Sequence, residues 1–293
     1  MADNIGNKAA HDYHLDVPVA QEGFYVKGAA HCDFGMKSRL ARMFDPKSGN
    51  TVMLAFDHGY IMGPTAGLER IDLVIPPLAP YVNVLMGTKG VFRSCISPAA
   101  PVAKCVRVTY DSTVLYDDMS NGGGIACDTE NALRMDAACV AVQTFIGAPG
   151  ESRSLELLCR TADAGARYGI PTLGVVAVGK QMERTEKFFQ LATRVLAENG
   201  ANVVKSYYCD GFERVAAACP VPIVIAGGKK LPELEALEMA YRAIAEGARG
   251  VDMGRNIFQS DCPAGMAQAI GKVVHGGYTA QQAFEVYQEI KNA

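Results

Sequence analysis

The feature of this sequence that most limits its fold is a regular alternation of short apolar segments with longer amphipathic ones. Eight segments of four to nine residues are apolar and rich in β-branched residues, and they recur about every 20 to 35 residues. They lie at residues 51–56, 82–86, 102–108, 137–145, 172–178, 201–208, 223–226 and 250–253. Because these segments are almost continuously apolar, they suit strands of a parallel sheet that is buried on both faces.

Amphipathic segments between these strands predict helices. They lie at residues 68–75, 130–136, 152–167, 185–199, 211–218, 234–246 and 263–274. Strands that alternate with helices over about 250 residues predict a single (β/α)8 barrel, and an open doubly wound sheet is the alternative. We expect residues 1–45 to form an N-terminal arm and residues 46–293 to form the barrel domain, with a terminal helix over 278–293.

The composition excludes several classes of protein. Twenty-eight basic residues against 31 acidic ones give a net charge of −3, which offers no general attraction for nucleic acid or an anionic membrane. No apolar run approaches the roughly 20 residues that span a bilayer, and the polar N-terminus does not resemble a signal peptide. The nine cysteines contain no CxxC pair, which argues against a zinc ribbon or a redox motif. We therefore expect a cytoplasmic protein with reduced thiols.

A charged residue within one apolar segment is the strongest evidence for a catalytic residue in this sequence. Lys205 follows Val203 and Val204 and precedes two tyrosines, near the end of a predicted barrel strand where such barrels carry their active sites. Burial disfavours the ammonium form and lowers the pKa of a lysine, and a neutral amine can attack a ketone to form a Schiff base. The alternative is a structural lysine whose charge is paired with a carboxylate.

Asp57 and His58 follow the first predicted strand. A carboxylate here could move protons or hold Lys205 in place, and His58 could act as an acid or a base. The alternative for both residues is an ordinary role in ordering the loop. The sequence has no HExxH motif and no cluster of histidine, cysteine and acidic residues, so we expect no metal site.

Two glycine-containing loops follow the seventh and eighth predicted strands. Gly227 and Gly228 belong to the sequence AGGKK, and Gly254 and Arg255 belong to DMGRNIF. Glycines let backbone N–H groups approach an anion, and the loops after these two strands are a frequent phosphate site in (β/α)8 barrels. Arg255 could add a bidentate contact to a phosphate. A third glycine-rich segment, at residues 121–126, lacks the pattern of a P-loop and is interpreted as an ordinary loop.

Several of these segments together resemble a known family. FDHG at 56–59, VVKSYY at 203–208, PVPIVIAGGKK at 220–230 and GVDMGRNIFQS at 250–260 are similar to class I, Schiff-base aldolases of the deoxyribose-phosphate and archaeal fructose-bisphosphate type. The likeness runs from about residue 35 to the C-terminus. It is closest to the thiolases of this family, which move the acetyl end of a phosphorylated diketone onto coenzyme A during degradation of the phosphorylated quorum signal autoinducer-2.

The resemblance implies a role for each matching position. It implies that Lys205 forms the Schiff base, that Asp57 is the carboxylate near it, and that the substrate phosphate is held by Gly227, Gly228, Gly254 and Arg255. It also implies a small phosphorylated ketone as substrate, coenzyme A as co-substrate, no bound cofactor, and a homodecamer built from five-membered rings.

The sequence departs from the family at one position. Family aldolases tend to place a tyrosine at the end of the fourth strand, where its phenol can move protons, but this chain has Phe145. Proton transfer would then pass to His58, Tyr207, Tyr208 or water, and the departure favours the thiolase over a plain aldolase. The alternatives are an aldolase of another sugar phosphate, a non-catalytic barrel that binds a phosphorylated ligand, and a flavin-binding barrel with the same phosphate loops.

Overall fold

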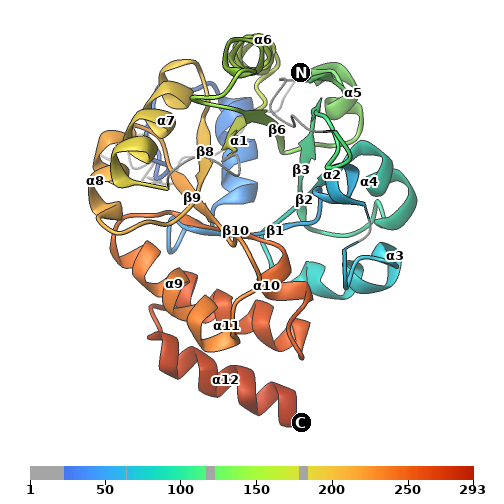
Figure 1. The fold of residues 1–293 in the computed structure, drawn as a ribbon, viewed down its shortest axis with the longest axis vertical. Coiled ribbons are helices and arrows are strands. Elements are labelled where there is room, and N and C mark those ends of the chain that lie inside the picture. The colour runs from blue at the N-terminus through green and yellow to red at the C-terminus, as the bar shows by residue number, and fades with distance from the viewer. Residues whose placement is uncertain (1–22, 64, 117–122, 178–183) are drawn as a thin grey trace, which may run out of the picture.

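Eight parallel strands close into a barrel in this protein, described by a computed structural model that covers residues 23–63, 65–116, 123–177 and 184–293. The strands are β1 (Thr51–Ala55), β2 (Val84–Thr88), β3 (Ala103–Arg107), β6 (Cys139–Thr144), β7 (Thr172–Val176), β8 (Val203–Ser206), β9 (Ile223–Ala226) and β10 (Gly250–Met253). Their order around the barrel is β1-β10-β9-β8-β7-β6-β3-β2 (Figure 1). The predicted (β/α)8 barrel is therefore confirmed, and the open sheet is excluded.

Helices surround the barrel, and seven of them match helices expected from the sequence (Figure 1). They are α5 (Thr129–Arg134), α6 (Glu151–Tyr168), α7 (Glu186–Glu198), α8 (Phe212–Ala218), α9 (Glu233–Ala245), α11 (Pro263–Gly276) and α12 (Ala280–Asn292). The helix expected at 68–75 is shorter, because prolines follow it. It is α3 (Ile71–Val74), continued by the 3-10 helix η1 (Pro76–Tyr81).

The structure also contains elements that the sequence pattern did not predict. They are α1 (Phe34–Met43), α2 (Gly59–Met62), α4 (Lys89–Cys95), α10 (Arg255–Phe258), and a two-stranded hairpin of β4 (Thr109–Tyr110) and β5 (Gly124–Ile125). Part of the glycine-rich segment 121–126 thus pairs as a strand, while residues 121 and 122 lie outside the described residues. Among the described residues, no helix is long and apolar enough to cross a membrane.

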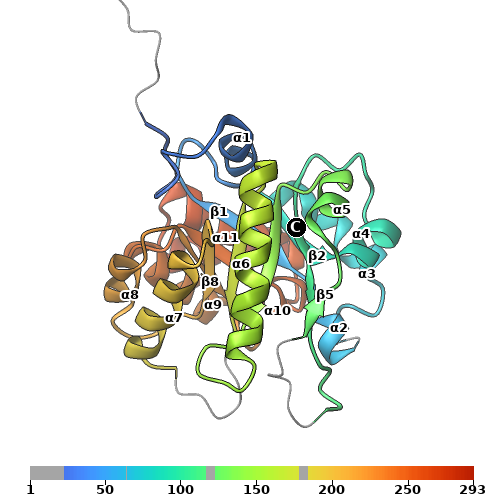
Figure 2. The same ribbon diagram turned by 90° about the horizontal axis from the view of Figure 1, so that it is seen from above.

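Alternation along each strand divides the apolar residues between two cores. Val52 and Leu54 of β1 point outward and pack beneath the helices, while Met53 and Ala55 point into the barrel. The interior is closed at the N-terminal ends of the strands by α1, whose Leu40 is fully buried there. Figure 2 shows α1 at the end of the barrel opposite α2. The open end, where functional side chains can reach solvent, is therefore the C-terminal one.

Residues 34–43 of the expected N-terminal arm thus lie against the barrel, and residues 1–22 of it are outside the described residues. The helix α1 begins at Asp33, whose carboxylate accepts a hydrogen bond from the Met36 amide over 2.7 Å. At the other terminus, α12 begins with a capping box between Thr279 and Gln282 and packs on α9 and α11 (Figure 1).

Truncating a side chain of α1 tests whether this helix is part of the barrel core. We expect Leu40→Ala to reduce the free energy of unfolding by about 2 to 5 kcal/mol, because it removes buried methyl groups and leaves a cavity. Phe34→Ala on the same helix is the control, since Phe34 is 88% exposed. Urea unfolding of both variants measures the difference, and equal stability would show that α1 does not close the barrel.

Candidate active site

All of the site residues expected from the sequence line one cavity at the C-terminal mouth of the barrel. Its volume is about 160 Å³. The residues from the sequence analysis that line it are Asp57, His58, Lys205, Gly227, Gly228, Gly254 and Arg255. The remaining lining residues are Ala55, Ile61, Arg107, Gln143, Val175, Tyr207, Ala226 and Asp252. Residues from the ends of seven of the eight strands therefore meet at this mouth, all but β2.

Lys205 points into the barrel because of its place in the alternation of β8. Val203 packs in the interior core and Val204 in the outer core, so the next residue returns to the interior. The lysine side chain is 12% exposed, and its Nζ lies 2.8 Å from Oδ2 of Asp252, which is fully buried on β10. Apart from this ion pair, neither carboxylate oxygen of Asp252 has a hydrogen-bond partner among the described residues.

This ion pair corrects the expected pKa of Lys205. Burial lowers the pKa, as the sequence suggested, but the negative charges of Asp252 and Asp57 outweigh burial and leave the pKa above its usual value. The amine is therefore protonated at rest and must lose a proton before it can attack a carbonyl. Burial raises the pKa of Asp252, so this carboxylate is a suitable acceptor for that proton.

Holding Lys205 in place was one possible role of Asp57. In the structure Asp57 is instead bound by an arginine of β3. Nη1 of Arg107 donates to Oδ2 of Asp57 over 2.9 Å, and Nη2 contacts Oδ2 of Asp111 at 3.1 Å. Nη2 also donates to the Tyr60 hydroxyl over 2.6 Å. The guanidinium is 3% exposed, so this buried cluster fixes the orientation of Asp57.

His58 lies at the edge of the cavity as a neutral imidazole. Burial lowers the pKa of His58, and the attraction of Asp57 does not restore it, while Arg255 and Lys205 lower it further. Its Nε2 lies 2.9 Å from the Thr65 hydroxyl. The ring stacks on Phe258, with ring centroids 5.9 Å apart. A neutral imidazole near the mouth can accept or relay a proton at neutral pH.

The two glycine loops are joined by a buried asparagine that the sequence analysis missed. Asn256 Nδ2 donates to the Gly227 carbonyl over 2.7 Å, and its Oδ1 accepts from the Leu231 amide over 2.8 Å. Gly254 is required by close packing, because a Cβ there would lie 2.2 Å from the Ala55 carbonyl oxygen. The loops after β9 and β10 thus form one rigid rim, to which Arg255 adds a positive charge.

The fourth barrel strand, β6, places a glutamine in the cavity and not the phenylalanine on which the sequence analysis focused. Phe145 follows the strand, is 5% exposed, and is absent from the lining of the cavity. Gln143, two residues earlier, lines the cavity, and its Oε1 accepts a hydrogen bond from Arg107. Phe145 therefore does not take the place of the family tyrosine in the cavity described here.

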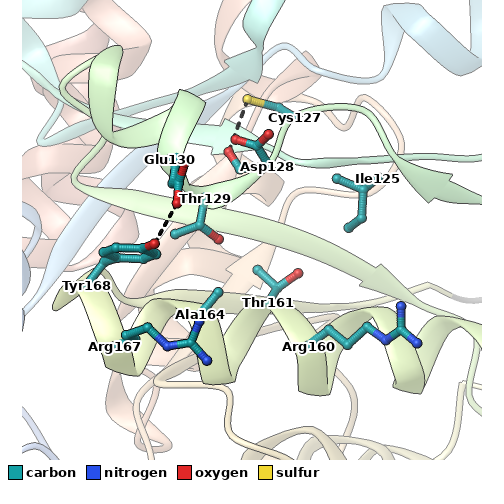
Figure 3. A pocket seen from close by; sticks show the side chains of 10 residues that line it. All are labelled: Ile125, Cys127, Asp128, Thr129, Glu130, Arg160, Thr161, Ala164, Arg167 and Tyr168. Atoms are coloured by element: carbon teal, nitrogen blue, oxygen red, sulfur yellow. Dashed lines mark hydrogen bonds between the residues drawn. The ribbon is translucent and has the colours of Figure 1, made fainter.

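A larger cavity, of about 390 Å³, lies outside the barrel between α5 and α6 (Figure 3). Arg160 and Arg167 of α6 line it together with Asp128 and Glu130, so its charges balance. Two of its lining residues are joined, because the Tyr168 hydroxyl donates a hydrogen bond to the Glu130 carboxylate over 2.6 Å. None of the candidate catalytic or phosphate-binding residues from the sequence lines this cavity. In the described parts of the chain, no group of three or more histidine, cysteine and acidic side chains could hold a metal.

Comparison with known proteins agrees with this geometry. The profile of the DeoC/LacD family aldolases matches residues 51–260, which include every strand of the barrel. An uncharacterized aldolase of Pasteurella multocida is 51% identical over 292 residues, covering 99% of this chain and all of that protein. This chain belongs to the DeoC/LacD aldolase family.

Other relatives, which carry more specific names, are about as similar to this chain. A 3-hydroxy-5-phosphonooxypentane-2,4-dione thiolase of Enterobacter sp. is 51% identical over 292 residues, covering 99% of this chain and 98% of that protein. The protein of that name from Yersinia pseudotuberculosis is 50% identical over 293 residues, covering both chains completely. Among solved structures, an archaeal fructose 1,6-bisphosphate aldolase superposes with a TM-score of 0.74 at 23% identity, covering 83% of this chain and all of that one. The structural likeness shows the shared fold.

Removing the Lys205 ammonium tests whether the buried pair with Asp252 exists. We expect Lys205→Met to lose about 3 to 5 kcal/mol of stability at pH 8, because it leaves a buried carboxylate without its partner. The folded-state pKa of Asp252 is raised, so the native state holds its proton more tightly than the unfolded state does, and stability rises as the pH falls. The loss should therefore shrink at pH 5.

Urea unfolding at the two pH values measures this effect, and the double variant Lys205→Met/Asp252→Asn is the control. It carries no buried carboxylate at residue 252, so it should recover stability at pH 8 and show a weaker dependence on pH. A single variant as stable as wild type at pH 8 would contradict the ion pair.

Proposed function

We propose that this chain is a thiolase that transfers the acetyl group of 3-hydroxy-5-phosphonooxypentane-2,4-dione to coenzyme A, giving acetyl-CoA and dihydroxyacetone phosphate. Two lines of support meet here. Relatives of 50–51% identity over the full chain carry this name. The mouth of the barrel holds a lysine beside a rim suited to a phosphate. The observation that carries the proposal is the Lys205 amine, 2.8 Å from a buried carboxylate inside that cavity.

The first step is formation of the Schiff base. Asp252 accepts a proton from the Lys205 ammonium, and the free amine attacks the substrate carbonyl next to the phosphate-bearing carbon, C4. Loss of water leaves a protonated imine. The substrate phosphate lies against Gly227, Gly228 and Arg255, where backbone N–H groups and the guanidinium hold the reacting carbonyl over the amine.

The second step is cleavage by the thiol. The sulfur of coenzyme A attacks the other carbonyl, C2, as the thiol gives up its proton. The bond between C2 and C3 then breaks, its electron pair passes into the imine, and an enamine and acetyl-CoA result. A proton delivered to C3 converts the enamine to the imine of dihydroxyacetone phosphate, and water releases the product from Lys205. His58, neutral and close to Asp57, is suited to relay protons in these steps.

Three further properties belong to this proposal. Coenzyme A acts as a co-substrate, and the reaction uses no bound cofactor or metal. The compartment is the cytoplasm, where coenzyme A is available to such an enzyme. The quaternary structure is a homodecamer, as the resemblance to family aldolases implies. Sedimentation velocity of the purified protein tests the last point, and a single monomeric species would contradict it.

Borohydride reduction with dihydroxyacetone phosphate tests the Schiff base. We expect mass spectrometry to locate the reduced adduct on Lys205, and Lys205→Met to show none. Lys272→Met is a control, because Lys272 is a surface residue of α11 whose amine lies 5.7 Å from the Tyr278 ring. Absence of any adduct on the wild-type protein would favour the non-catalytic barrel, and a yellow purified protein would favour the flavin-binding one.

Removing the Arg255 guanidinium tests the phosphate site. Among the described residues Arg255 forms no ion pair, so its charge is available to a ligand. We expect Arg255→Ala to weaken binding of dihydroxyacetone phosphate by about 1.5 to 3 kcal/mol, measured by calorimetric titration. Arg249→Ala, an exposed position before the start of β10, is the control and should bind normally. Equal weakening of unphosphorylated dihydroxyacetone would show that Arg255 supports the structure of the mouth instead.

A further inference from the structure

The order of polar groups around the barrel matches the order of groups along the proposed substrate. The glycine loops follow β10 and β9, Lys205 comes from β8, and Gln143 comes from β6, two strands farther on in the same direction. A substrate whose phosphate lies at the loops and whose C4 joins Lys205 therefore extends its remaining carbons toward β6. Those carbons include C2, the carbonyl that the thiol attacks.

The strand register places Gln143 at the height of Lys205. Lys205 pairs with Val175 of β7, and Val175 pairs with Gln143. All three residues line the cavity, so they form one level of the barrel interior with an apolar side chain between two polar ones. Neighbouring strands are about 4.8 Å apart, so the backbones of the two polar residues are about 10 Å apart. Both side chains therefore line the same cavity, from the strands on either side of β7.

Arg107 determines which end of the Gln143 amide is available. A guanidinium only donates hydrogen bonds, so its contact must be with the amide oxygen, and Oε1 of Gln143 indeed accepts from Nη2 of Arg107. The amide nitrogen then faces away from Arg107. Among the described residues no hydrogen bond to this nitrogen is found, although the residue lines the cavity. The arginine itself also lines the cavity, but it is 3% exposed and its guanidinium is paired with Asp57 and Asp111, so its role is to orient the amide.

We propose that the Gln143 side-chain amide is a catalytic residue that donates a hydrogen bond to the C2 oxygen of the substrate, with Arg107 as its positioning residue. This inference rests on the proposed function. When sulfur adds to C2, the carbonyl electron pair moves onto oxygen, and a fixed N–H donor stabilises the resulting oxyanion. Collapse of this adduct restores the C2 carbonyl as the bond to C3 breaks. A donor at this point therefore acts on thiolysis, which forms the oxyanion at C2, and not on formation of the imine at C4.

Two substitutions at residue 143 distinguish the effect of the N–H donor from the effect of the rest of the side chain. Gln143→Glu keeps an oxygen that can accept from Arg107 but has no N–H donor, and Gln143→Met keeps the length of the side chain without polar atoms. We expect each to reduce kcat for acetyl-CoA formation by about 100- to 1000-fold, as removal of one oxyanion donor does. KM for the dione should change little, because the donor acts mainly on the oxyanion.

Borohydride trapping of dihydroxyacetone phosphate on the same variants is the second readout. This ligand forms the imine but presents no C2 carbonyl, so trapping on Lys205 should remain near wild type. Gln288→Glu, exposed on α12, is the matched control and should retain full activity. Thiolysis within about threefold of wild type for both Gln143 variants would overturn this inference while leaving the proposed function intact. Loss of trapping together with thiolysis would also overturn it, since Gln143 would then support the imine or the fold. Failure of wild type to trap or cleave would overturn the proposed function itself.

Discussion

The interior of this barrel holds two opposite charges, and neither could be buried at an acceptable free energy without the other. Lys205 and Asp252 project from β8 and β10 into the same space, with 12% and 0% of their side chains exposed. A buried charge without a partner costs several kcal/mol, so each residue depends on the other and on the strand order that brings them together. The same contact gives the lysine a proton acceptor within hydrogen-bonding distance. The constraint that stabilises the pair is therefore also the one that permits its chemistry.

The fold was predictable because its signal is repeated along the whole chain. Eight apolar segments with helices between them leave few arrangements that bury both faces of a sheet, and the barrel is one of them. Most of the elements that were missed are short, such as α10, and in these the local propensity is weak and tertiary packing decides. Helix α1 was also missed, because its apolar residues are significant only once the barrel presents an interior for them to cover.

The site was predicted less completely, and the reason lies in the pairing of side chains. Lys205 was found because a charge interrupts an apolar strand, and the same signal was present for Asp252 in GVDM and Arg107 in VAKCVRV. The sequence does not say which carboxylate meets which cation, since barrel closure and register decide that. One of the two roles considered for Asp57 was to hold Lys205 in place, whereas the structure pairs Lys205 with Asp252 and Asp57 with Arg107. Gln143 carried no signal of its own, and only its place opposite the glycine loops gives it a role.

The central claim is that the imine at Lys205 serves thiol-dependent cleavage, and single-turnover product analysis with and without coenzyme A tests it most directly. Enzyme in excess over 3-hydroxy-5-phosphonooxypentane-2,4-dione is quenched at intervals, and both products are quantified. The account predicts that acetyl-CoA and dihydroxyacetone phosphate appear together in equal amounts and only when coenzyme A is present. Release of dihydroxyacetone phosphate at the same rate without coenzyme A, or no cleavage with it, would contradict the account.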